Sequence, residues 1–321
     1  MDRVTQTIKR LDRTQQKHRV LSFPYAVIKK YGDDNGSYQA ALITYYGFLS
    51  LFPLLLVAVV VLQFLFHNEN LRADILHNIA NYFPVVGEQL QHNIHTTRVG
   101  LGLVVGLIIA LYGARSGADA LRYTLDHTWL TPHHKRAGFP KGMLRSFGVI
   151  GVGAFGLALS VVISGFSSLL GHTIWQTIIA NVLGALGLTW VLLLAFRIAS
   201  SKAVAYKDMF VGTFCGAVVM QLLLTFGGIL VRHQLRSLGS LYGTFAIVLG
   251  LLFWLYLLAQ VLVYAIEIDT VRTLRLWPRS ITPELKTDGD RRAYDLYAKS
   301  ARYMPDEKVF VEFDNQEHQR P

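Results

Sequence analysis

Six long apolar runs constrain the fold of this chain more than any other feature of its sequence. A helix needs about 20 consecutive apolar residues to cross the hydrocarbon core of a bilayer. The runs lie near residues 39–66, 99–121, 147–170, 177–196, 209–231 and 241–266. Because they are continuous and do not alternate in polarity, they favour helices over a barrel. The sequence therefore predicts an all-α, polytopic membrane protein with six transmembrane helices.

The composition agrees with this class of protein. Only 16% of the residues are charged, whereas about a quarter are charged in a typical soluble domain. The first 38 residues are polar and lead into no short apolar region with a cleavage site. We therefore expect the first span to serve as an uncleaved signal.

The positive charges are distributed unevenly between the two sides of the predicted membrane. With the N-terminus placed inside, the inner segments hold 25 Lys and Arg residues and the outer segments hold four. This asymmetry predicts that both termini are cytoplasmic. Basic flanks of this kind suit anionic lipid headgroups, so we expect membrane lipids as partners and no nucleic acid, despite the net charge of +10.

The chain divides into three predicted regions: a cytoplasmic segment 1–38, a transmembrane domain 39–270 and a cytoplasmic tail 271–321. Residues 18–31 have the pattern of an amphipathic helix, which could lie on the membrane surface or dock on the protein itself. A second amphipathic, interfacial helix is expected in the external segment 67–98. The tail is rich in charge and poor in apolar residues, so we expect it to be partly helical and partly disordered.

Four charged residues of alternating sign follow the second apolar run. Residues three or four apart share one face of a helix, so Arg115, Asp119, Arg122 and Asp126 should form a stripe. Charges beside lipid are costly unless they are paired. The stripe is therefore either a structural ladder or the lining of a polar cavity in which an arginine binds an anionic headgroup.

Two further charged residues are expected at the cytoplasmic ends of other spans. Arg197 closes the fourth span and Glu267 closes the sixth. A cluster of Arg115, Asp119, Arg122, Arg197 and Glu267 is therefore possible, and it forms the candidate ligand-binding site.

The first span carries a candidate groove. Pro53 leaves the carbonyl of Leu49 without its usual donor, so a kink is expected. Tyr45 and Tyr46 precede this kink, and at least one of them should face protein. Small residues four apart, such as Gly212 and Gly216, should allow helix backbones to approach closely in lipid.

No feature of the chain supports catalysis, and we expect neither a catalytic site nor a metal or other cofactor. The nucleophile, metalloprotease and phosphate-loop motifs are absent from the sequence. His77, His92 and His95 lack the acidic or cysteine partners of a metal site. The single cysteine, Cys215, permits no disulfide within the chain.

Two segments of the sequence resemble a known family. "AALITYYGFLSLFPLLLV" (40–57) resembles the first-helix signature of the YihY/virulence factor BrkB family of bacterial inner-membrane proteins. "LYGTFAIVLGLLFWLYLLAQVLVYAIEIDT" (241–270) is similar to the last helix of that family. The matching residues of the last helix are Tyr242, Gly243, Phe245, Trp254, Leu255, Tyr256 and Glu267. Thr244 stands for a serine, and Ala265, Ile266 and Asp269 depart from the pattern.

The resemblance implies a multi-pass protein of the bacterial inner membrane, and the lipopolysaccharide-export-related branch is the nearest. The family was formerly labelled ribonuclease BN, but this sequence lacks a cytoplasmic His/Asp cluster that could hold zinc. The resemblance implies a role in the envelope, including movement of lipid or lipopolysaccharide precursors.

These observations lead to two functional hypotheses. The first is a transporter-like protein that handles an anionic phospholipid or a lipid A-type precursor through a polar groove with arginines at its cytoplasmic end. The alternative is an envelope scaffold or regulator that binds protein partners without transport.

Overall fold

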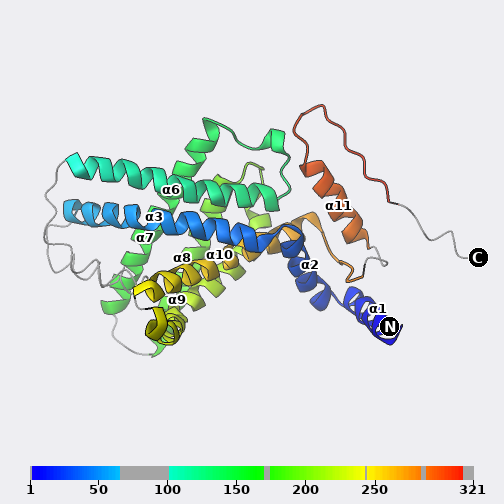
Figure 1. The fold of residues 1–321 in the computed structure, drawn as a ribbon, viewed down its shortest axis with the longest axis horizontal. Coiled ribbons are helices and arrows are strands. Elements are labelled where there is room, and N and C mark those ends of the chain that lie inside the picture. Colours follow the sequence, from blue (N-terminus) through cyan, green and yellow to red (C-terminus); the bar gives the residue numbers. More distant parts are fainter. Residues whose placement is uncertain (1, 66–100, 170–173, 243, 283–286, 314–321) are drawn as a thin grey trace, which may run out of the picture.

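A computed structural model describes residues 2–65, 101–169, 174–242, 244–282 and 287–313 (Figure 1). These residues form α-helices, one short 3₁₀ helix and connecting segments, with no strand in the part described. The helices are α1 (Asp2–Lys17), α2 (Arg19–Asp33), α3 (Gly36–Leu65), α6 (Leu101–Thr128), η1 (His133–Lys135), α7 (Lys141–Leu169), α8 (Ile174–Ala199), α9 (Tyr206–Tyr242), α10 (Thr244–Leu274) and α11 (Asp288–Ser300). The prediction of an all-α chain is confirmed for these residues.

Each of the six apolar runs coincides with one long helix. Within the described residues, three helices are long and apolar enough to cross a membrane, over Ile178–Ala199, Tyr206–Gly227 and Val248–Leu274. The predicted amphipathic helix of segment 67–98, with His77, His92 and His95, lies outside the described residues.

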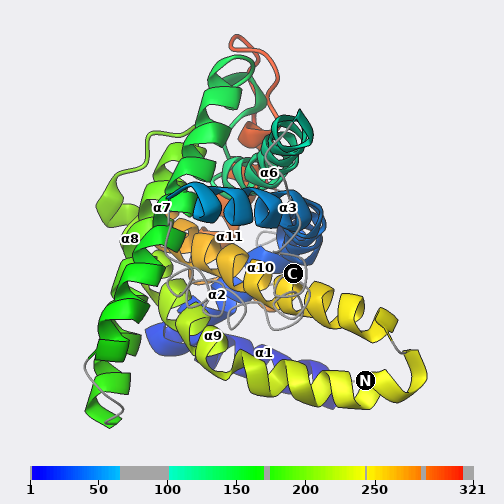
Figure 2. The ribbon, with the colours of Figure 1, turned by 90° about the vertical axis from the view of Figure 1, so that its left-hand side faces the viewer.

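The six long helices form a bundle through a ring of pairwise contacts, and Figure 2 shows α7 and α9 spreading apart away from one end of it. In this ring α6, α3, α10, α9, α8 and α7 contact one another in order, and among the described residues the contact that joins α7 back to α6 is the least extensive. The main apolar core lies at one end of the bundle, where Leu125 and Trp129 of α6 meet Phe196 of α8, Met209 of α9 and Ile266 of α10. The contact between α6 and α7 is therefore a seam in an otherwise tightly joined bundle.

Glycines allow the close helix approach that the spacing of Gly212 and Gly216 predicts, and the helix that approaches α9 there is α10. A Cβ at Gly216 would lie 2.6 Å from the Cβ of Ala265, and one at Gly212 would overlap the carbonyl oxygen of Ala265. The Gly212 N–H also donates to the Asp269 carboxylate at 2.6 Å, and the Thr213 N–H donates to it at 3.2 Å. Close backbone approach and a shared carboxylate thus hold these two helices in register.

Segments near the two ends of the chain pack together beyond the same end of the bundle (Figure 1). We call residues 2–34, 275–282 and 288–300 the terminal block. Ala26 and Val27 of α2 pack against Val271 of α10. They also pack against Leu276, which follows α10, and against Ala293 of α11. The tail therefore contributes an ordered helix, whereas residues 314–321 lie outside the description and their expected disorder stays a prediction.

Two buried carboxylates hold the terminal block together. Asp290 accepts hydrogen bonds from Arg279 Nε at 2.6 Å and from the Ser280 N–H at 2.9 Å, and it completes a capping box with Thr287. Asp12 of α1 accepts from the backbone N–H groups of Ile281 and Thr282 at 3.1 and 3.2 Å. These bonds join α1 and α11 to the segment that follows α10.

We expect acid to detach α11 and α1 from the terminal block. Burial raises the pKa of Asp12 and of Asp290, but the hydrogen bonds that each carboxylate accepts outweigh this effect, so both pKa values are lowered. A carboxylate with a lowered pKa stabilises the fold above the ordinary carboxyl pKa of about 4, and this contribution is lost as the pH falls through the lower, folded value.

Hydrogen exchange of residues 288–300, measured from pH 7 down to pH 3, checks this expectation. The protection factor, which is the intrinsic exchange rate at each pH divided by the observed rate, should fall only at the acid end of the series. The Asp290→Asn variant should already exchange quickly at pH 7, because the amide replaces a charged acceptor. Exchange that is equally slow in the variant and the parent at pH 7 would contradict the assignment.

A candidate anion site at the seam between α6 and α7

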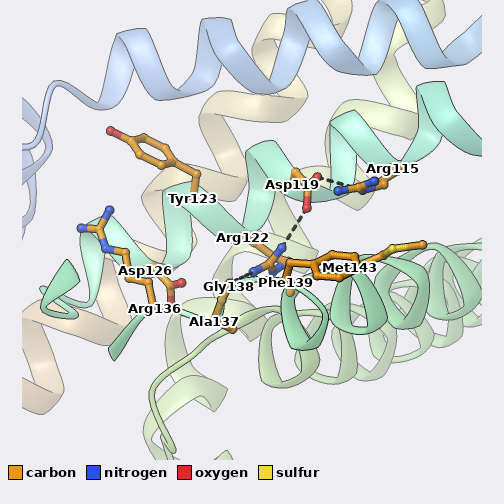
Figure 3. A pocket seen from close by; sticks show the side chains of 11 residues that line it. Arg115, Asp119, Arg122, Tyr123, Asp126, Arg136, Ala137, Gly138, Phe139 and Met143 are labelled. Carbon is orange, nitrogen blue, oxygen red and sulfur yellow. Dashed lines mark hydrogen bonds and ion pairs between the residues drawn. The ribbon is translucent and has the colours of Figure 1, made fainter. Parts of the chain in front are cut away.

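Three of the four residues of the charged stripe predicted on α6 form consecutive ion pairs. Asp119 lies between two arginines of the same helix, with Arg115 Nε at 3.4 Å and Arg122 Nη1 at 2.8 Å. Helical spacing places these three side chains on one face. Asp119 thus neutralises part of the charge of both guanidinium groups (Figure 3).

Arg122 is a clamp between α6 and the start of α7. Its Nη1 donates to Ser146 Oγ at 3.1 Å, and its Nη2 donates to the carbonyl of Ala137 at 2.9 Å. The side chain is only 12% exposed. Ser146 also donates to Asp119, which closes a small network across the seam. The guanidinium of Arg122 is therefore largely occupied by the protein.

A cavity of about 320 Å³ opens beside this clamp. Its lining comes from α6, from the segment that joins η1 to α7, and from the first turn of α7 (Figure 3). The lining residues are Arg115, Asp119, Arg122, Tyr123, Asp126, Arg136, Ala137, Gly138, Phe139, Gly142 and Met143. Three arginines and two aspartates thus share the cavity with two aromatic rings and a methionine.

Arg136 is a member of this cavity that the sequence analysis missed. Its Nε donates to the carbonyl of Thr131 at 3.1 Å, and its guanidinium lies 5.8 Å from the centroid of the Tyr123 ring. Among the described residues, the Nη groups of Arg136 and of Arg115 have no hydrogen-bond acceptor. These two arginines are therefore the ones whose terminal nitrogens are available to a ligand.

The predicted five-residue cluster is divided by the fold. Arg115, Asp119 and Arg122 lie together, but Arg197 of α8 lies against the ring of Tyr206, 5.8 Å from its centroid. Glu267 of α10 is fully buried and pairs with Lys30 Nζ at 3.0 Å. Neither Arg197 nor Glu267 lines the cavity.

Asp126, the last residue of the stripe, binds the segment that connects α8 to α9. Its carboxylate accepts from the backbone N–H of Ser201 at 2.8 Å and from Ser201 Oγ at 2.7 Å. It thus ties the end of α6 to the segment between α8 and α9.

Lys30 is a second residue that the sequence analysis missed. Its side chain is 0% exposed and contacts Glu267, Asp34 and the carbonyl of Thr128, the last at 3.0 Å. Burial lowers the pKa of Lys30, but the two carboxylates outweigh burial and raise it, so the ammonium stays charged. We call Lys30, Asp34 and Glu267 the buried ion cluster; it joins α2 and its C-terminal turn to α10 and the end of α6.

The predicted groove residues of α3 do not line the cavity. Tyr45 is exposed and its ring lies 5.1 Å from that of Tyr46. The backbone of Tyr46 faces Gly117 of α6, where the two helices lie side by side. Pro53 lies within α3, and its side chain is outside the description, so the kink stays a prediction.

The tail supports the outer wall of the cavity. The ring of His133 stacks on that of Tyr303 with centroids 4.3 Å apart, and the His134 N–H donates to the carbonyl of Arg302. Arg136 follows η1 directly. The segment after α11 therefore braces the connection that carries the third arginine.

In the part of the chain that the structure describes, no group of three metal-ligating side chains comes together. The chemistry of the cavity is that of anion recognition: guanidinium groups match the geometry of phosphate oxygens, and the adjacent rings offer apolar surface.

Comparison with known proteins agrees with this picture of a membrane protein. The chain is 29% identical over 189 residues to an uncharacterized protein of Dickeya dadantii, covering 54% of this chain and 56% of that one. It is 24% identical over 282 residues to a UPF0761 membrane protein of Psychrobacter sp., covering 80% of this chain and 49% of that one. The chain thus spans about half the length of these curated relatives, and no solved structure matches it. Because residues 27–286 match the virulence factor BrkB family, the chain belongs to that family.

Proposed function

We propose that this protein is a non-enzymatic, transporter-like protein of the bacterial inner membrane that binds the phosphate of an anionic lipid in the cavity at the α6–α7 seam. The six long helices cross the membrane, and both termini are cytoplasmic. The observation that carries the proposal is the presence of Arg115 and Arg136 in the cavity with unoccupied Nη groups.

The surroundings of the cavity suit an amphipathic ligand. Phe139, which lines the cavity just before α7, and Leu144, in the first turn of α7, are both strongly exposed. In the membrane such side chains contact the acyl chains of a lipid, while the arginines of the cavity contact its headgroup. An anionic phospholipid and a lipid A-type precursor both offer this combination of phosphate and acyl chain.

The location at the seam supports movement of the lipid. Among the described residues the α6–α7 contact is the least extensive in the ring of helices, and Arg122 spans it. Separation of α7 from α6 would open a path along the bundle without breaking the joined pair of α9 and α10. We propose no nucleotide-driven step.

Arg136→Gln and Arg115→Gln should each weaken binding of fluorescent phosphatidylglycerol by tenfold or more, because a hydrogen bond to a charged group contributes about 1.5–3 kcal/mol. Binding is measured on the full chain in detergent, with lipid A as competitor. Transfer of the same lipid across proteoliposome membranes should slow in parallel. Lys141→Gln, which removes an exposed charge next to the cavity, is the matched control and should bind normally.

Arg122→Gln is a less informative test, because Arg122 is the clamp of the seam and its loss should lower stability. Unchanged binding and transfer by folded Arg136→Gln and Arg115→Gln would contradict the proposal.

A scaffold function is the alternative, and the exposed end of the tail favours it. Phe310 is 87% exposed, and Tyr303 and Met304 are also exposed. Deletion of the whole tail would remove Arg279 and Asp290 and disrupt the terminal block, so it cannot separate the two functions. Phe310→Asp leaves the block intact: a scaffold should lose its envelope phenotype, whereas a lipid carrier should keep normal lipid transfer.

A further inference from the structure

The N-terminal helix pair presents an apolar stripe to the outside of the protein. Val20 is 84% exposed and Ile28 is 59% exposed, and Leu21 and Pro24 are exposed between them. Positions 20, 24 and 28 are four apart, so these side chains lie along one face of α2. We call Val20, Leu21, Pro24 and Ile28 the apolar stripe.

The opposite face of α2 is already occupied. Ala26, Val27, Lys30 and Tyr31 are buried against α10, α11 and the end of α6. The orientation of α2 about its axis is therefore set by the terminal block and the buried ion cluster. The apolar stripe is held outward by the fold, and adjacent exposed apolar side chains of this kind mark a candidate surface for contact with membrane or protein.

The position of α2 along the chain puts the stripe at the membrane surface. Only Asp34 and Asn35 separate the end of α2 from the start of α3, and Asn35 adopts a φ of 54° that allows the sharp turn. Figure 1 shows α2 and α1 turning away from the line of α3. If α3 crosses the bilayer, as the proposed function states, α2 must lie within one turn of the point where α3 enters it.

Positive charge accompanies the stripe. Arg10, Arg13 and Lys17 are exposed at positions three and four apart on α1, opposite the buried Asp12 and Gln15. Among the described residues, these three side chains have no acidic partner within ion-pair distance. An apolar stripe combined with a basic face is the chemistry that binds an anionic lipid surface.

We propose that α1 and α2 lie on the anionic surface of the same bilayer, with the apolar stripe inserted between headgroups and Arg10, Arg13 and Lys17 facing phosphates. This resolves the two alternatives for residues 18–31: one face of α2 docks on the protein, and the other binds lipid. The proposal rests on the membrane placement in the proposed function but not on the ligand of the cavity.

Site-specific quenching tests the proposal in the full-length protein. Cys215 is the single cysteine, so a Cys215→Ser background accepts one labelled cysteine at a time. Val20→Cys and Ile28→Cys replace exposed side chains and should fold normally. Ala301→Cys, at an exposed position outside the stripe, is the control. Each variant carries an environment-sensitive fluorophore and is reconstituted into phosphatidylcholine vesicles with or without phosphatidylglycerol.

Labels at residues 20 and 28 should be blue-shifted and quenched by spin-labelled lipid, whereas the label at residue 301 should be quenched by iodide in water. Phosphatidylglycerol should strengthen the lipid quenching. The Arg10→Gln/Arg13→Gln/Lys17→Gln variant should lose that increase, each charge removed weakening the attraction about fivefold.

Iodide quenching of labels at 20 and 28 in both vesicle types would overturn the proposal. Binding of fluorescent phosphatidylglycerol at the cavity is measured on the same triple variant and should be unchanged. Iodide quenching at residues 20 and 28 in a protein that still binds lipid at the cavity would therefore be a failure of this proposal and not of the proposed function.

Discussion

Lys30→Met should lower the free energy of unfolding by about 3–5 kcal/mol, because it leaves two carboxylates without their shared cation in a buried site. Lys30 and Glu267 are both 0% exposed, and their charged atoms are 3.0 Å apart. Asp34, which Lys30 also contacts, is 3% exposed. Thermal unfolding of the detergent-solubilised protein measures the loss.

Lys299→Met is the matched control for this change. Lys299 pairs with Asp295 at 2.7 Å with the same spacing of four residues as Lys30 and Asp34, but its side chain is 49% exposed. An exposed pair of this kind contributes only about 0.3–0.5 kcal/mol. The triple variant Lys30→Met/Asp34→Asn/Glu267→Gln removes all three charges and should recover most of the stability lost in Lys30→Met. Equal, small effects at Lys30 and Lys299 would refute the buried ion cluster.

Gly212→Ala should be destabilising by about 3 kcal/mol or more, although it adds a single methyl group. The new Cβ would overlap the carbonyl oxygen of Ala265, a backbone atom that cannot rotate away. Overpacking typically costs about 1–3 kcal/mol, and separation of α9 from α10 would also break the bond from the Gly212 N–H to Asp269, which contributes about 1.5–3 kcal/mol.

Gly153→Ala gives the comparison within the same protein. Gly153 lies in α7 with no atom within 4 Å of an added Cβ, so alanine should be neutral or should stabilise the helix by up to about 1 kcal/mol. Thermal unfolding of the two variants in one detergent gives the difference directly. Similar midpoints for both would show that α9 and α10 are not in contact at Gly212.

The charged stripe shows how far sequence reasoning reached into the site. Helical periodicity is enough to predict that Arg115, Asp119 and Arg122 share a face, and the ion pairs at 3.4 and 2.8 Å agree. Periodicity could not reveal that Arg122 bonds across the seam to Ser146 and Ala137. It also could not reveal Arg136, which reaches the cavity only because the connection after η1 folds back.

Glu267 illustrates the opposite case. Its position at the end of the last predicted span, α10, suggested a partner among the arginines of α6. The bundle instead places Glu267 beside Lys30, 237 positions earlier in the chain. Burial decides this choice. A carboxylate enclosed by α2, α6 and α10 pairs with the cation that the same helices enclose, and no local pattern encodes which cation that is.

The sequence by itself determined the class of the protein and the helices, because apolar length and helical spacing are local properties that any helix must satisfy. It also indicated a face of α9 that another helix can approach closely, since glycines four apart leave only backbone there, but not that α10 is the helix that does so. Only the tertiary structure decided which charges meet, which arginines are left with unoccupied donors, and which face of α2 points outward. Those outcomes depend on contacts between segments tens to hundreds of residues apart, and such contacts form only once the helices are packed.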